Sequence, residues 1–72
     1  MSNELKFLLS KRELEVFKLI TQGLSTKDIS ESLALRPNTI STIKKNINYK
    51  LGTRSDLDVF KLALKNKLVK LQ

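Results

Sequence analysis

The sequence predicts an all-α protein: a four-helix, helix-turn-helix domain with a short N-terminal arm. Three observations support this fold class. Capping pairs of the type Ser-x-x-Glu or Ser-x-x-Asp occur three times, each followed by apolar residues at a helical spacing. Only three or four residues separate the second expected helix from the third, as in a helix-turn-helix. The 72 residues include no cysteine, so disulfides cannot stabilise the fold and helix packing must.

The first helix is expected over residues 11–22. Ser10 precedes it and Glu13 follows three positions later, a pairing in which each side chain satisfies the other residue's free backbone N–H. Gly23 favours the left-handed conformation that ends a helix. One face of this helix carries the residues expected in the core: Glu13, Val16, Phe17 and Ile20.

The second helix is expected over residues 26–33. Ser25 and Asp28 form the second capping pair, and Ile29 and Leu33 lie one helical turn apart on the face expected to be buried. The three residues that follow, from Ala34 to Arg36, then form the turn of the helix-turn-helix.

The third helix is expected over residues 37–51. Pro37 fits the first position of a helix, and Gly52 provides the stop. The core face consists of Ile40, Ile43, Ile47 and Leu51. The opposite face is expected to be a polar surface without any acidic residue: Ser41, Thr42, Lys44, Lys45, Asn48 and Tyr49.

The fourth helix is expected to start after Ser55, paired with Asp58, and to run to about Asn66. It has more apolar residues than one core-facing stripe requires: Leu57, Val59, Phe60, Leu62, Ala63 and Leu64. Two interpretations stay open, because such a helix is either deeply buried or partly covered by a second copy of the protein.

The chain length allows a single domain, expected over residues 9–72, with residues 1–8 as an N-terminal arm or the stub of a linker. No apolar run approaches the roughly 20 residues that span a bilayer. We therefore expect no membrane partner and a cytoplasmic location.

Lysine and arginine number 14 against 7 acidic residues, a net charge of +7 that indicates a polyanionic partner. The alternative is a solvated basic surface without a ligand. Histidine and cysteine are both absent, which excludes the common zinc sites and most histidine-based catalysis. The sequence therefore predicts a DNA-binding protein without metal or cofactor, and not an enzyme.

A polar helix face fits the major groove of duplex DNA, which the second helix of a helix-turn-helix enters. The expected ligands on residues 37–51 are Ser41, Thr42, Lys44, Lys45, Asn48 and Lys50. Lys27, at the start of the second helix, is expected to bind a phosphate. Asp28 competes for the same helix terminus, and we favour Asp28 as the cap and Lys27 as the ligand.

The most specific stretches of the sequence are Leu9–Glu13 with Glu15–Val16, Gly23–Ile29, Asn38–Ile40, and Asn46–Ile47 with Lys50–Gly52. In these stretches the chain resembles the LuxR/FixJ/GerE-type DNA-binding domain of bacterial response regulators and quorum-sensing regulators, and the match runs without gaps from Leu9 to about Val69. The resemblance implies a third helix in the major groove and a fourth helix that mediates homodimerisation. It places base contacts on Ser41, Thr42 and Lys45, backbone contacts on Lys27, Thr39 and Lys50, and the dimer face on Leu57, Lys61 and Leu64.

Three residues depart from the family's pattern. Ser41 stands where lysine is frequent, and Ile43 where histidine or tyrosine is frequent, so the target sequence does not follow from the resemblance. Asp56 stands where the family usually has arginine, so a usual anchoring interaction of the fourth helix does not follow from the resemblance.

Two other interpretations compete with this one. Region four of sigma factors is similar through the third helix and predicts contact with RNA polymerase, although Lys50-Leu51-Gly52 and the capped helix after it favour the LuxR-type domain. A protein-interaction module that sequesters a full-length regulator would need Leu57 and Leu64 but not Lys45.

Overall fold

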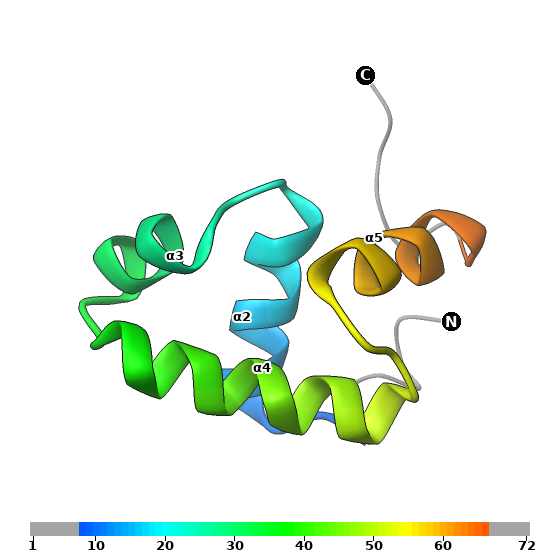
Figure 1. The fold of residues 1–72 in the computed structure, drawn as a ribbon, viewed down its shortest axis with the longest axis horizontal. Coiled ribbons are helices and arrows are strands. Elements are labelled where there is room, and N and C mark those ends of the chain that lie inside the picture. The colour runs from blue at the N-terminus through cyan, green and yellow to red at the C-terminus, as the bar shows by residue number, and fades with distance from the viewer. Residues whose placement is uncertain (1–7, 67–72) are drawn as a thin grey trace.

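The computed structural model describes residues 8–66, and in this range the protein has four helices and no strand. The helices are α2 (Lys11–Thr21), α3 (Thr26–Leu33), α4 (Pro37–Leu51) and α5 (Asp56–Lys65), shown in Figure 1. The all-α, helix-turn-helix prediction is confirmed, with α2 one residue shorter than expected. Most of the predicted arm and the last six residues of the predicted domain lie outside the described residues.

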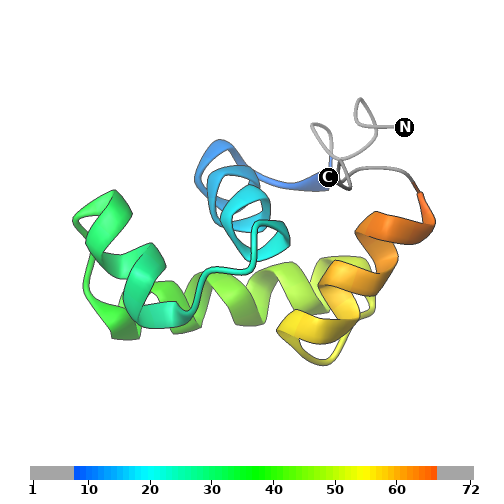
Figure 2. The ribbon, with the colours of Figure 1, turned by 90° about the horizontal axis from the view of Figure 1, so that it is seen from above.

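α4 is the longest helix and lies across one side of the domain, where α2 packs against its middle (Figures 1 and 2). α3 and α5 flank α2 and lie over opposite ends of α4. α2 and α4 each contact the other three helices, so the packing is centred on the α2–α4 pair. The face of α4 that points away from α2 is therefore left outside the bundle.

The core lies between α2 and α4 and is closed by α3 and α5. Its buried apolar residues are Leu9, Val16, Phe17, Ile20, Ile29, Ile40, Ile47, Val59 and Ala63. The predicted core face of the first helix is confirmed, including the buried carboxylate of Glu13. On α4, Ile40 and Ile47 are fully buried, while Ile43 and Leu51 are partly buried against the core.

The first two predicted capping pairs form as reciprocal boxes, and the third forms only in part. The Ser55 hydroxyl accepts the Asp58 N–H at 3.2 Å, but the Asp58 carboxylate accepts the Arg54 N–H at 3.0 Å instead of the Ser55 N–H. The Ser55 backbone has φ −158°, against −67° at Ser10 and −77° at Ser25. This rotation about the N–Cα bond turns the Ser55 N–H away from Asp58.

The turn between α3 and α4 is as short as expected. Ala34 adopts a left-handed conformation at φ 55°, and the Leu35 N–H donates to the Ser30 carbonyl at 3.0 Å, which closes the end of α3. Pro37 then occupies the first position of α4, where its missing N–H leaves no helical hydrogen bond unmade. This turn fixes the position of α4 relative to α3. None of the described helices has the length and apolar character needed to cross a membrane.

Candidate nucleic-acid interface

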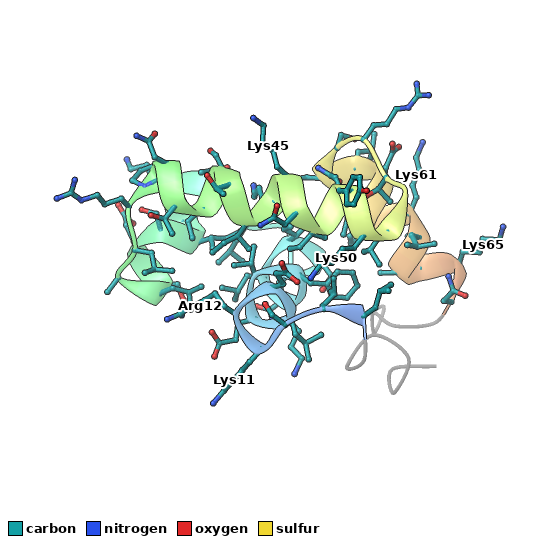
Figure 3. All side chains as sticks on the ribbon, turned by 90° about the horizontal axis from the view of Figure 1, so that it is seen from below. Lys11, Arg12, Lys45, Lys50, Lys61 and Lys65 are labelled. Carbon is teal, nitrogen blue, oxygen red and sulfur yellow. The ribbon has the colours of Figure 1, made fainter. Side chains whose placement is uncertain are left out.

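The outer face of α4 is a continuous polar surface without a carboxylate, since α4 itself contains no acidic residue. Lys45 extends from it away from the rest of the domain (Figure 3). The Thr42 hydroxyl donates to the Asn38 carbonyl at 3.1 Å, which orients it on this face. We call the following exposed residues the outer face of α4: Asn38, Thr39, Ser41, Thr42, Lys45, Asn46 and Tyr49.

The predicted place of Lys44 on this surface is wrong. Lys44 is 9% exposed, and its ammonium donates to Asp56 Oδ2 at 2.6 Å and to Thr26 Oγ1 at 2.8 Å. Lys44 lies four residues after Ile40 and three before Ile47, so it shares the helix face of these two core residues. The Lys44 ammonium is therefore paired within the domain and does not belong to the outer face of α4.

Lys50 and Asn48 also have partners within the domain. The Lys50 ammonium donates to Glu13 Oε1 at 2.7 Å, and Lys50 lies between α4 and α2 (Figure 3). The half-buried Asn48 accepts a hydrogen bond from the Thr53 hydroxyl at 2.6 Å through its side-chain oxygen. Lys50 remains 36% exposed, so its ammonium stays accessible from solvent.

The hydrogen bond from Lys50 is the largest cause that lowers the pKa of Glu13 below its ordinary value of 4.5, followed by the bond from the Ser10 N–H. Burial acts in the opposite direction but is outweighed. The charged carboxylate is thus favoured in the folded chain. Glu13 both caps α2 and ties it to the end of α4.

Glu13→Gln is expected to lower the free energy of unfolding by about 1–3 kcal/mol at neutral pH, because the variant cannot form the charged hydrogen bond with Lys50. A lowered folded pKa stabilises the fold above the unfolded value of 4.5, and this stability is lost as pH falls through the folded pKa. The difference in the free energy of unfolding between wild type and variant should therefore decrease as the pH falls from about 6 to about 2. Urea unfolding at several pH values measures it.

Glu15→Gln is the matched control, because Glu15 pairs with Arg12 on the surface at 3.0 Å with both side chains substantially exposed. It should change the free energy of unfolding by no more than about 1 kcal/mol. A Glu13→Gln variant with the pH dependence of wild type would contradict the assigned role of the Glu13–Lys50 pair.

Lys27 is exposed in the first turn of α3, as expected for a phosphate ligand. Asp28 and Ser25 cap this helix reciprocally, with N–H to oxygen distances of 3.2 and 3.4 Å. The preferred interpretation of Asp28 as the cap is therefore confirmed. Lys27 and Thr39, which stands in the first turn of α4, both remain open to solvent.

α5 combines a buried and an exposed face. Val59 and Ala63 are buried, whereas the apolar Phe60 is only half-buried. On the predicted dimer face Leu57 is 59% exposed and Lys61 is exposed, while Leu64 is half-buried. Lys61 and Lys65 both project outward from α5 (Figure 3). Deep burial of the whole helix is thus excluded for the described part of the chain.

The predicted site residues did not include Tyr49, which the structure leaves 89% exposed on the outer face of α4. The sequence held the signal, because Ser41, Lys45 and Tyr49 follow one another at intervals of four residues and share a helix face. Two arginines were also missed: Arg36 at the N-cap of α4 and Arg54 before α5 are both exposed. They extend the basic surface beyond both ends of α4.

The short turn between α3 and α4 and the exposed, carboxylate-free face of α4 define a helix-turn-helix domain. Residues 8–63 match the GerE family, described as bacterial regulatory proteins of the luxR family. The chain therefore belongs to this family, as the resemblance indicated, and the family is one of regulatory proteins rather than of enzymes.

Characterised relatives agree with this assignment. The chain is 43% identical over 61 residues to BvgA, a positive transcription regulator of virulence factors in Bordetella pertussis, covering 85% of this chain and 29% of BvgA. It is 42% identical over 62 residues to the oxygen regulatory protein NreC of Staphylococcus aureus, covering 86% of this chain and 29% of NreC. The chain thus corresponds to less than a third of either relative's length.

Proposed function

We propose that this chain binds double-stranded DNA in a sequence-specific way to regulate transcription, with α4 in the major groove and α5 joining two copies. The single observation that carries the proposal is the exposed, carboxylate-free outer face of α4. Family membership supports it, as does the name of BvgA as a transcription regulator. Binding would place the chain on the nucleoid.

The outer face of α4 offers two kinds of contact to DNA. Ser41, Thr42 and Lys45 are exposed on this face, and their hydroxyl and ammonium groups match the donors and acceptors of base edges. Lys27, Thr39 and Lys50 surround this centre and are assigned to the phosphate backbone. Lys50 keeps its bond to Glu13, because an ammonium has three donors and can bind a phosphate as well.

The proposed dimer face consists of Leu57, Lys61 and Leu64 on one side of α5. The exposed Leu57 supports this assignment, since a two-fold axis would bring the face against its own copy and remove apolar surface from water. Two α4 helices would then lie about 34 Å apart, so that both enter the major groove one turn of DNA apart.

A protein-interaction module is the second candidate function, and the exposed Leu57 also supports it. Such a module would sequester a regulator or contact RNA polymerase through α5. It needs the apolar face of α5 but not Lys45, so variants of the two surfaces separate the candidates.

The first experiment is selection of bound sequences from a random duplex pool, followed by titration of the recovered duplex. Lys45→Ala is expected to weaken binding by about five- to 150-fold, the effect of removing one side chain from a base edge. Lys11→Ala is the matched control, because it removes the same charge from an exposed residue on the opposite side of the domain from Lys45 (Figure 3). It should leave affinity nearly unchanged.

Equal affinities of Lys45→Ala and wild type, or an equal loss from Lys11→Ala, would overturn the assignment of α4 to the major groove. Leu64→Glu tests the dimer face by sedimentation on DNA. Loss of the two-copy complex with retained binding to a half-site supports the proposal, and an unchanged complex contradicts it.

A further inference from the structure

The Lys44 ammonium joins three helices at one point. Lys44 belongs to the middle of α4, Thr26 is the first residue of α3 and Asp56 is the first residue of α5. The ammonium lies 2.8 Å from the Thr26 hydroxyl and 2.6 Å from the Asp56 carboxylate. In residues 8–66 these are the only side-chain hydrogen bonds between α4 and either of these helices.

This placement needs the Asp56 carboxylate. The N-terminus of a helix carries a partial positive charge, and the ammonium of Lys44 lies beside two such termini with its side chain only 11% exposed. Asp56 neutralises the ammonium, and as the first residue of α5 it is itself stabilised by that helix terminus. Because Asp56 is 45% exposed, the pair borders solvent on the side of Asp56 alone.

We propose that Lys44 is a positioning residue: paired with Asp56, it fixes the angle between α4 and α5 and thereby the separation of the two α4 helices in a dimer. This inference rests on the proposed function. α5 packs more extensively on α2 than on α4, so the pair is a main direct link between the helix assigned to DNA and the helix assigned to dimerisation. The pair also joins α5 to α4 at Asp56, the position where the resemblance leads one to expect an arginine.

The first test is a stability cycle on the chain without DNA, using Lys44→Met, Asp56→Asn and the double variant. Methionine keeps most of the length of lysine without its charge. Asp56→Asn is expected to lower Tm by about 10 °C, because it leaves the Lys44 ammonium beside two helix termini without a counter-charge. The double variant should recover part of that loss. Strictly additive effects would overturn the inference.

The second test measures spacing preference, which a general loss of stability would not change. Duplexes carry the two selected half-sites with the spacer lengthened or shortened by one base pair at a time. The double variant keeps the net charge of +7 because it loses one charge of each sign. It should bind the preferred duplex about two- to thirtyfold more weakly and discriminate less among spacers.

The salt dependence of binding separates positioning from direct binding of DNA. If Lys44 bound a phosphate, its replacement would reduce the slope of log affinity against log salt by about 0.9 for each phosphate released. The double variant is expected to keep the wild-type slope. A reduced slope, or a spacing preference equal to that of wild type, would overturn this inference and leave the proposed function intact. A wild-type chain that bound no duplex would overturn the proposed function, and this inference with it.

Discussion

Replacing Ile47 by alanine is expected to lower the free energy of unfolding by about 2–5 kcal/mol. Ile47 is fully buried in α4, the helix against which α2 and α3 pack. The substitution removes three carbon atoms from a site enclosed by neighbouring helices, so it reduces both the burial of apolar surface and the van der Waals packing across the core.

The expected total stability of a 72-residue domain is only about 4–11 kcal/mol, so Ile47→Ala removes a large part of it. Urea unfolding followed by circular dichroism measures the loss as a lower transition midpoint. Tyr49→Ala is the matched control on the same helix, because Tyr49 is 89% exposed and alanine favours the helix. Equal midpoints for the two variants would contradict the assigned core face of α4.

The helices could be predicted closely because their boundaries depend on local chemistry. Pro37 and Gly52 each fix the backbone at their own position, and the Ser10 and Ser25 caps involve residues only three apart. The capping box predicted at Ser55 forms only in part, since the partner of the Asp58 carboxylate depends on the path of the loop before α5. Local patterns specify which residues are able to cap but not the φ angle of that loop.

The incorrect prediction for Lys44 has two separate causes. Its helix face was available from the sequence, because Lys44 stands at the i+4 position of Ile40 and the i−3 position of Ile47. The charge of a lysine favours an exposed position, but the spacing of Lys44 from these two core residues decides which way its side chain points. The partner was not available, since Asp56 lies 12 residues away and reaches Lys44 only through the packing of α5.

The Glu13–Lys50 pair shows the same limit at a larger separation. The capping role of Glu13 follows from its distance of three residues to Ser10, and that role is confirmed. Its bond to Lys50 spans 37 residues and depends on how α2 crosses α4. The sequence therefore predicted the cap formed by Glu13 but not the bond that Glu13 accepts from Lys50.

The affinity for DNA is expected to fall about a hundredfold as salt rises from about 50 to 200 mM, a slope near −3.6 in log units. This value follows if Lys27 and Lys50 of two copies neutralise four phosphates in the proposed complex. Both lysines are exposed enough to reach a backbone that runs past the ends of α3 and α4. Fluorescence anisotropy with the selected duplex at several salt concentrations measures the slope.

Lys27→Ala should reduce that slope to about −1.8, because each copy then neutralises one phosphate fewer, and it should weaken binding to selected and unrelated duplexes alike. Lys11→Ala removes the same charge on the far side of the domain and should keep the full slope (Figure 3). A change of about 0.9 instead would indicate a single copy on the DNA, since only one Lys27 would then bind a phosphate. An unchanged slope would remove Lys27 from the phosphate ligands and leave α4 as the main source of affinity.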